Sequence, residues 1–466
     1  MTNSTNGSAD LIDELDRHFG DRCLRPGDGA YDEAIGLWNA AAQAYPSLVV
    51  RCLDTGDVVA ALEAVTSHDT PFSVKGGGHM TTGAAVVEDG VVFDLSPMDD
   101  VSVDESAGTV RVGGGATWPE VNQAALERGL IPPGIPDTAG VAGFTLGGGM
   151  GVTCRLAGLA CDNLREAEVV TAGGSVVSAS EDENADLFWA LRGGSGNVGI
   201  ATALEFDCVR GDRDCLVANV LYPINDAEAY LDHFAESVDS LPDATFPVAA
   251  ILEIPPLPDL PEALHGETAV AGYVMGVGTD EELKATLEDF ADFGNPHVAA
   301  VYPVDYTDLY EPFQIDHGQR HHWESFYLDA LTDDFVEALL NEATPLATPT
   351  SSVAIYGLGG AIDRVAHDAT AYAHRGAPFA AHIQTHWTDP DDDDRYVEWT
   401  RSVHEALRGH GTGGEYVNNQ TDKDDARIEA AYGDHYDRLA AVKAECDPED
   451  RFRSTQHVAP DAAGHD

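Results

Sequence analysis

Short apolar runs alternate with helical periodicities over the first 210 residues of the chain. The run SLVVRCL predicts a strand, and the following DTGDVVAALEAV predicts an amphipathic helix with Asp54 or Thr55 as its N-cap. Further strands are predicted for PFSVK, VVFDL and TVRVGGG, and a second helix for residues 118–128, with a proline in its first turn. Because clusters of glycine interrupt this alternation, we expect a β/α region with several tight loops.

The pattern changes between about residues 211 and 410. Helical segments (DAEAYLDHFAESV, TDEELKATLEDFADF, TDDFVEALLNEA) alternate there with β-rich runs (TFPVAAILEI, TAVAGYVMGVG, SSVAIYGLGG, FAAHIQTHW). This order predicts an α+β domain built on an antiparallel sheet. No internal repeat with a period of about 20 to 50 residues occurs, and the acidic run at residues 389–394 is interpreted as a solvated loop.

The charge balance excludes several classes of partner. Among 466 residues, 25 Lys and Arg stand against 81 Asp and Glu, a formal net charge of −56, while 43% of the residues are apolar. The chain can therefore bury a large core, and its acidity is that of a folded protein rather than of a disordered tail. Because so negative a surface repels nucleic acids and anionic membranes, neither is expected as a partner.

The acidic excess extends through every segment, which favours adaptation to a high-salt cytoplasm, as in a haloarchaeon, over an acidic mesophilic protein. The N-terminal sequence has no basic region followed by an apolar one, and no apolar run approaches the roughly 18 residues of a membrane-spanning helix. We therefore expect a soluble, cytoplasmic protein. Seven cysteines without a CxxC pair indicate buried free thiols rather than disulfides or a zinc site.

Three glycine-rich loops are candidates for cofactor binding: residues 76–79, 147–151 and 193–199. Loops of this kind bring successive backbone N–H groups close to an anion, so they suit a diphosphate. The third loop matches GxGxxG, a dinucleotide-binding motif that lies between a strand and the helix after it. Here the motif follows the helical DLFWALR and precedes the strand-like IATALEF, so we reject a Rossmann site for NAD.

Several long segments occur in a characteristic order: PFSVKGGGHM, TVRVGGGATWPEV, GVAGFTLGGGMG, and the stretch from LACDNLREAEVV to LRGGSGNVGIAT. Together they resemble the flavin-binding region of the vanillyl-alcohol-oxidase superfamily, in particular its berberine-bridge-enzyme-like FAD oxidases. The C-terminal YVNN and YGDHYDRLAAVKAECDPEDRF resemble the closing segment of that family. The resemblance extends from about residue 20 to residue 460, which makes it far more specific than a single glycine motif.

The resemblance implies an α+β fold with a two-part FAD-binding domain of the PCMH type. Residues 1–210, with a core at about 42–210, would form this domain together with a returning segment at residues 411–466. Residues 211–410 would form an α+β substrate domain whose antiparallel sheet covers the flavin ring. The β/α and α+β regions that the periodicities predict agree with this division.

In the family, the histidine that ends the first glycine loop bonds covalently to the flavin 8α-methyl group, and His79 matches it. A neutral imidazole suits this bond because one ring nitrogen is nucleophilic. The cysteine of a second linkage, found in many plant members, is Pro136 here, so the resemblance implies a single covalent link to FAD. The other residues implied to contact FAD are Lys75, Gly76, Gly77, Gly78, Thr138, Gly140, Gly143, Gly148, Gly149, Asn163, Val198 and Asn418.

Hydride transfer to a flavin requires a base for the O–H or N–H proton of the substrate. Tyr416, the first residue of YVNN, is the first candidate, although the second tyrosine of the family motif is Asn419 here; a core or hydrogen-bonding tyrosine is the alternative. In FAAHIQTHW, alternation puts His382, Gln384 and His386 on one face of a strand. The resemblance implies that His382 or Gln384 lies beside the substrate, and an exposed polar face is the alternative.

The sequence thus predicts an FAD oxidase of CH–OH or CH–NH groups in a small-molecule substrate, with O₂ as the acceptor and hydrogen peroxide as a product. The alternatives are a dehydrogenase of the same fold with another acceptor, and a flavoprotein with a mainly binding role. The resemblance implies that a bulky residue at position 139 hinders the reaction of reduced flavin with oxygen. Ala139 is small, so it favours the oxidase over the dehydrogenase. His321 and His322 are interpreted as packing or substrate contacts, and no metal is expected.

Overall fold

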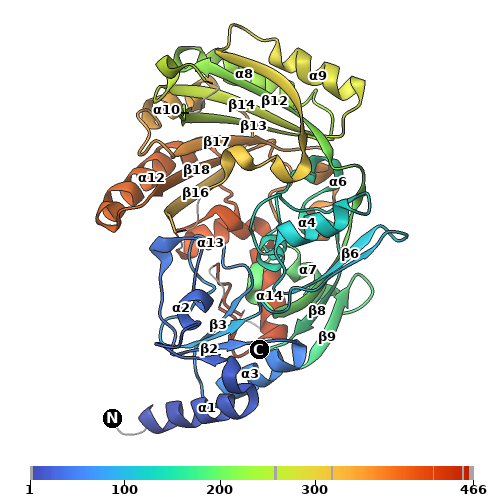
Figure 1. Ribbon diagram of the computed structural model, residues 1–466, viewed down its shortest axis with the longest axis vertical. Coiled ribbons are helices and arrows are strands. Elements are labelled where there is room, and N and C mark those ends of the chain that lie inside the picture. Colours follow the sequence, from blue (N-terminus) through green and yellow to red (C-terminus); the bar gives the residue numbers. More distant parts are fainter. Residues whose placement is uncertain (1–3, 257–259, 316–317, 423, 454–455, 461–466) are drawn as a thin grey trace.

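The computed structural model (Figure 1) describes residues 4–256, 260–315, 318–422, 424–453 and 456–460. A large sheet with helices on its outer side forms the upper half of the view, and the N-terminal sheets with the C-terminal helices form the lower half. Within these described ranges, no helix has both the length and the apolar character needed to span a bilayer.

The N-terminal sheet has four strands in the order β1-β2-β4-β3, with β2 and β3 both parallel to β4. Its strands are β1 (Cys23–Leu24), β2 (Leu48–Arg51), β3 (Phe72–Lys75) and β4 (Val91–Asp94). Helix α3 (Thr55–Ser67) connects β2 to β3, and the Asp54 carboxylate accepts the N–H of Asp57 at 3.0 Å. The predicted N-cap at Asp54 is therefore confirmed. Helix α1 (Ser4–Phe19) packs against α3.

A second sheet is antiparallel, with five strands in the order β5-β6-β10-β8-β9. They are β5 (Val101–Asp104), β6 (Thr109–Gly113), β8 (Leu164–Val170), β9 (Val176–Ser180) and β10 (Ile200–Asp207). Its core also contains residues of helices from both ends of the chain. These are α4 (Trp118–Leu126), α5 (Val141–Leu146), α7 (Ala185–Leu191), α13 (Asp425–Tyr432) and α14 (Tyr436–Cys446). The third glycine loop lies between α7 and β10, the helix-then-strand order that the sequence predicts; β7 (Leu130–Ile131) pairs with β11 (Val209–Arg210).

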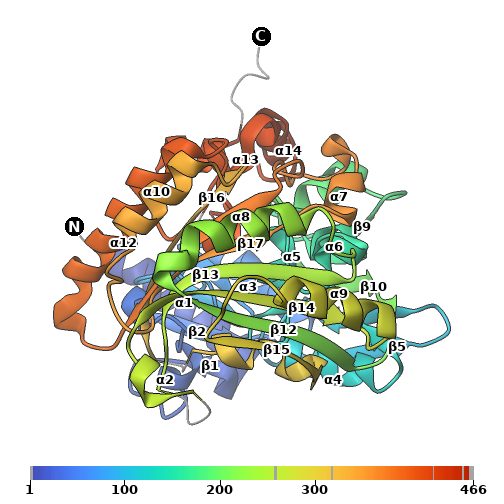
Figure 2. The same cartoon turned by 90° about the horizontal axis from the view of Figure 1, so that it is seen from above.

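The third sheet has seven antiparallel strands in the order β15-β12-β14-β13-β17-β18-β16. They are β12 (Asp214–Pro223), β13 (Thr245–Glu253), β14 (Thr268–Val277), β15 (Val298–Asp305), β16 (Arg320–Leu328), β17 (Ser352–Gly357) and β18 (Phe379–Trp387). Four helices cover its outer face (Figures 1 and 2): α8 (Ala227–Val238), α9 (Glu281–Ala291), α10 (Asp333–Glu342) and α12 (Asp393–Leu407). This arrangement confirms the predicted α+β fold, and the other face of the sheet is turned toward the N-terminal half.

Some elements differ from the sequence prediction. The acidic run is not a plain solvated loop: Asp389 caps a 3-10 turn (Pro390–Asp392), and Asp393 begins α12. The Asp393 carboxylate also accepts the indole N–H of Trp387 at 2.7 Å and pairs with Arg320. The sequence patterns do not predict α1, β12, β15 or β16. The short helices are α2 (Tyr31–Ala34), α6 (Cys154–Ala157) and α11 (Ala361–Arg364).

The cysteines agree with the prediction of free thiols. All seven are unpaired, and five of them, Cys23, Cys52, Cys154, Cys161 and Cys215, are buried. Burial raises the pKa of the Cys154 thiol to about 12, so this group stays protonated near neutral pH. These thiols contribute to packing.

Candidate active site

One face of the β16 and β18 pair lies against the N-terminal segment, the second glycine loop and the YVNN turn. The antiparallel register places three pairs of residues opposite each other: Ser325 with His382, Trp323 with Gln384, and His321 with His386. Because successive side chains of a strand alternate between its faces, these six share one face, which we call the β16–β18 face. Ile383 and Phe326 lie on the other side, in the core beneath the outer helices. The alternation predicted for β18 is confirmed.

Tyr416 lies buried at one end of the β16–β18 face. Its phenol oxygen accepts hydrogen bonds from the backbone N–H groups of Gly149 (3.2 Å) and Met150 (3.0 Å) and from the Asn418 side-chain amide (3.1 Å). Burial raises the pKa of Tyr416 to about 12, and the three hydrogen bonds oppose that rise because they favour the phenolate. The N–H of Tyr416 donates to Ser325 Oγ at 3.1 Å. The second glycine loop and the YVNN turn therefore meet at one oxygen atom.

His382 lies beside Tyr416 and is 3% exposed. Its ring centroid is 6.0 Å from the Tyr416 ring and 4.3 Å from the Tyr356 ring. The side-chain amide nitrogen of Asn419 contacts Nδ1, whereas Nε2 has no hydrogen-bond partner among the described residues. Burial lowers the pKa of His382 to about 3, so the ring is neutral near neutral pH. A neutral imidazole held at one nitrogen and open at the other is suited to bind a ligand.

Gln384, the second candidate on β18, has a more occupied side chain. The Ser352 hydroxyl donates to its Oε1 at 3.4 Å, and a side-chain hydrogen bond links it to Tyr356. Both partners belong to β17, so the Gln384 amide is tied to the sheet. Of the two candidates, His382 has the polar atom without a partner.

At the opposite end of the β16–β18 face, three aromatic rings form a stack. Trp38 lies between His79, at a centroid distance of 4.2 Å and an angle of 16°, and His321, at 3.7 Å and 5°. The Nδ1 atoms of His321 and His386 are 2.7 Å apart. The Asn39 side-chain amide donates a hydrogen bond to the carbonyl of His321 at 2.9 Å, and its oxygen accepts one from the backbone N–H of His321 at 2.8 Å. The predicted flavin-linking His79 is thus held by the segment containing Trp38 and Asn39, residues that sequence analysis missed.

The first glycine loop has the geometry of an anion cradle. A Cβ atom on Gly77 would lie 2.5 Å from the backbone nitrogen of Gly140, so the close approach of these two chains requires glycine. In the part of the chain that the structure describes, the N–H groups of Gly76, Gly77 and Gly78 have no hydrogen-bond acceptor. Lys75, 9% exposed, forms no ion pair within the same ranges. Free donors beside a buried cation fit the diphosphate of FAD.

The remaining predicted FAD contacts have different environments. Gly148 and Gly149 have φ values of +114° and +83°, which glycine adopts more readily than other residues. The Asn163 amide donates to three carbonyl oxygens of the preceding turn at 2.8 to 3.3 Å, and Val198 is fully buried in the core. In the structure, both side chains support the packing of the protein itself. The predicted contacts that are exposed are Thr138 and Gly143.

A buried charge network fastens the C-terminal segment to the edge of β16. Arg427 pairs with Glu324 and Glu415, which are 1% and 4% exposed. His322 Nε2 lies 3.1 Å from Glu324 and 3.5 Å from Asp422. Burial lowers the pKa of Arg427, but its hydrogen bonds to the two carboxylates outweigh that effect and the pKa is raised. Since the guanidinium bonds to carboxylates on β16 and beside Tyr416, the network positions the YVNN turn against the sheet.

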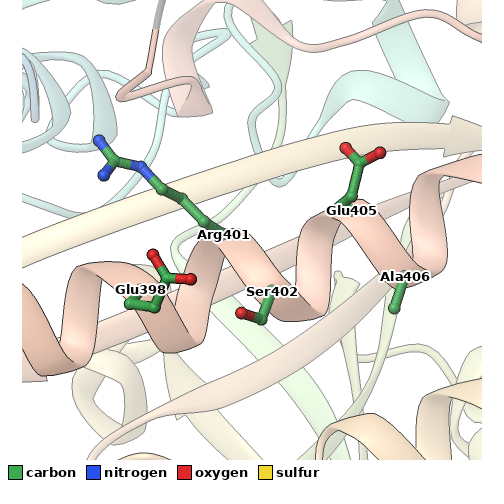
Figure 3. Close-up of a pocket in the computed structure, with 5 residues that line it drawn as sticks. All are labelled: Glu398, Arg401, Ser402, Glu405 and Ala406. Atoms are coloured by element: carbon green, nitrogen blue, oxygen red, sulfur yellow. The ribbon is translucent and has the colours of Figure 1, made fainter.

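A surface hollow of about 580 Å³ lies on α12, and Figure 3 shows the side chains that line it. It is lined by Glu398, Arg401, Ser402, Glu405 and Ala406, all exposed residues of one helix. Helix α12 covers the outer face of the sheet, on the side opposite the β16–β18 face. The hollow is therefore separate from the site that contains Tyr416, His382 and His79.

Comparison with known proteins agrees with this geometry. Residues 46–180 match the family model described as FAD binding domain, and residues 415–459 match the one described as berberine and berberine like. An uncharacterized FAD-linked oxidoreductase of Bacillus subtilis, YgaK, is 28% identical over 94% of this chain and 97% of its own length. (R)-6-hydroxynicotine oxidase of Paenarthrobacter nicotinovorans is 26% identical over 94% of this chain and 97% of its own.

The fold is also that of a solved oxidase. Glucooligosaccharide oxidase from Acremonium strictum superposes with a TM-score of 0.85 and 22% identity, covering 97% of this chain and 99% of that one. The two family models, the full-length relatives and the fold define the class of this protein. It is an FAD-linked oxidoreductase with a PCMH-type, berberine-bridge-like fold.

Proposed function

We propose that this enzyme is an oxidase that removes hydride from a CH–OH or CH–NH group of a small molecule and passes the electrons to O₂, giving hydrogen peroxide. When bound, FAD supplies the hydride acceptor. The observation that best supports the proposal is the pair at one end of the β16–β18 face: Tyr416, whose oxygen has three N–H donors, and His382, whose Nε2 has no partner among the described residues. Two of the proteins named above are oxidases of 6-hydroxynicotine and of glucooligosaccharides, so alcohols, sugars and amines are the substrate classes to test first.

In this proposal the two side chains have different tasks. The Tyr416 phenolate takes the O–H or N–H proton of the substrate, and its three donors stabilise the negative charge before that transfer. His382 Nδ1 accepts the Asn419 amide, so the proton of the neutral ring is on Nε2. This N–H donates to the oxygen or nitrogen of the substrate and orients the bond that breaks.

The proposal also covers the cofactor and the domains. Lys75 and the N–H groups of Gly76, Gly77 and Gly78 hold the FAD diphosphate, and His79 forms the single covalent link. Residues 1–210 and 411–466 form the FAD domain, and residues 211–410 form the substrate domain. Pro136 leaves the position of a second, cysteinyl link without a thiol.

The location and salt requirement are a separate part of the proposal. The net charge of −56 supports a cytoplasmic protein of a high-salt organism, because screening at molar salt removes most of the repulsion between surface carboxylates. The melting temperature should rise steeply as KCl increases from about 0.1 M to about 3 M. A flat curve would contradict the halophilic interpretation.

Anaerobic mixing of the holoenzyme with panels of alcohols, oligosaccharides and amines tests the activity. A substrate should bleach the flavin absorbance, and air should restore it with formation of hydrogen peroxide. A dehydrogenase would bleach but recover rapidly with an artificial acceptor and slowly with air. A flavoprotein with a binding role would not bleach with any member of the panels.

A further inference from the structure

A second cluster of ligating side chains lies between two short turns, apart from the β16–β18 face. His367 belongs to the 3-10 turn His367–Ala369, and Asp434 and His435 belong to the 3-10 turn between α13 and α14. One ligand atom of each lies within 4.8 Å of the other two. His367 Nε2 is 3.0 Å from Asp434 Oδ2, and His435 Nε2 is 3.9 Å from Asp434 Oδ1. Two imidazoles and a carboxylate therefore converge, although 67 residues separate His367 from Asp434.

His435 is the unusual member of the cluster. It is 6% exposed; its ring lies near the backbone of Ala371, but neither ring nitrogen makes a hydrogen bond of normal geometry among the described residues. Buried polar atoms are normally satisfied, so a buried imidazole without a hydrogen bond of normal geometry at either nitrogen leaves room for an additional ligand.

The cluster differs from the buried network at β16 because no arginine neutralises its carboxylate. Within the described ranges, the ion pairs of Asp434 are those with His367 and His435. Arg438, which is nearby, is engaged by Asp186 and by the ring of Trp189. A hollow of about 230 Å³ lined by Glu429, Gly433, Asp434, Tyr436 and Asp437 lies beside the turn, and the side chains of His367 and Asp434 are exposed to solvent.

We propose that His367, Asp434 and His435 bind one Zn²⁺, with water as the fourth ligand. Zn²⁺ favours imidazole nitrogen with carboxylate oxygen in a four-coordinate site, and Asp434 already lies close to both rings. The ion links the segment that leads to Tyr372 with the C-terminal segment. Tyr372 packs closely against Gly148 and Gly193, because a Cβ atom on either glycine would collide with it. The metal link therefore stabilises the wall of the active site. The sequence does not predict this site, because His367 lies 67 residues before Asp434 and only the fold brings the two together.

The test uses the holoenzyme stripped with a chelator and then titrated with Zn²⁺ against a chromophoric chelator, at high salt and with excess Mg²⁺ to suppress diffuse attraction. Wild type should bind one equivalent, and its melting temperature should rise until that equivalent is reached. His367→Ala and Asp434→Asn should each weaken binding by at least about tenfold and remove the thermal shift. Both residues are exposed, so the variants should fold.

Two matched variants control for unspecific effects. His410→Ala removes an exposed histidine elsewhere, and Asp437→Asn removes a carboxylate beside the turn that is not a proposed ligand. Both should bind Zn²⁺ as wild type does. Equal binding by His367→Ala and wild type, equal weakening by Asp437→Asn and Asp434→Asn, or no stoichiometric binding by wild type would each overturn the proposal.

Discussion

The two ends of the β16–β18 face are built from different chemistry. At one end, polar atoms meet: the Tyr416 oxygen has three N–H donors, and His382 contacts Asn419 through one nitrogen. At the other end, flat rings meet: His79, Trp38 and His321 stack. In the proposed function, the polar end takes the proton of the substrate, and the stacked end holds the flavin ring. Substitutions at the two ends should therefore separate flavin attachment from substrate chemistry.

The largest effect is expected at the stacked end. His79→Ala should abolish covalent flavin, because it removes the nucleophilic nitrogen. Acid-precipitated wild-type protein should retain its yellow colour, whereas the variant should release flavin into the supernatant. His410→Ala, which removes an exposed histidine, should behave as wild type. Free flavin from wild type, or bound flavin in His79→Ala, would contradict the assignment.

At the polar end, Tyr416→Phe should leave flavin attachment intact and lower the rate of anaerobic flavin reduction by about 10²–10⁴, the usual contribution of a general base. Tyr222→Phe is the matched control, because its hydroxyl bonds to the Phe293 carbonyl (2.7 Å) in the core beneath the outer helices, away from the β16–β18 face. The control should reduce the flavin at close to the wild-type rate. Reduction at wild-type rate in Tyr416→Phe would contradict Tyr416 as the base.

The pH dependence distinguishes the same two side chains. The pKa of Tyr416 is raised to about 12, so below that pH the phenolate fraction, and with it the reduction rate, should increase about tenfold per pH unit. His382, with a pKa lowered to about 3, stays neutral over the whole range and adds no step near neutral pH. Stopped-flow reduction from pH 6 to pH 10 measures this slope. A plateau that begins near pH 7 would contradict Tyr416 as the base.

The smallest effect concerns oxygen. Ala139 is 7% exposed and lies next to the Gly77 and Gly140 contact, so a larger side chain would fill space beside the first glycine loop. Ala139→Leu should slow the reoxidation of reduced flavin by O₂ several-fold and leave reduction by substrate nearly unchanged. Equal reoxidation rates in variant and wild type would remove this support for an oxidase, and a parallel loss of both rates would indicate damage to the cradle.

Much of the polar end could be predicted from the sequence, and little of the stacked end could. Strict alternation in β18 identified the face of His382, because its opposite side is apolar. Strand β16 has a polar residue on each face, His321 on one and Glu324 on the other. Its sequence therefore does not alternate between polar and apolar positions, and the pattern does not identify which face is buried. Trp38 lies outside regular structure, and only tertiary packing brings it to His79.

The buried network shows the same limit. Arg427 and Glu324 are 103 residues apart, and each is an ordinary charged residue in its own segment. In so acidic a chain, nothing in the local sequence distinguishes a buried carboxylate from the many that are exposed. Long-range ion pairs of this kind become visible only when the C-terminal segment is placed along the edge of β16.

The most direct test of the central claim is a single turnover of the holoenzyme with its substrate, first without air and then with O₂ admitted, in wild type and Tyr416→Phe. Wild type should bleach and then recover, with one hydrogen peroxide formed per substrate oxidised. Tyr416→Phe should bleach more slowly by about 10²–10⁴ and recover at the wild-type rate. Recovery without peroxide would contradict the oxidase, and unchanged bleaching in the variant would contradict the role of the polar end of the β16–β18 face.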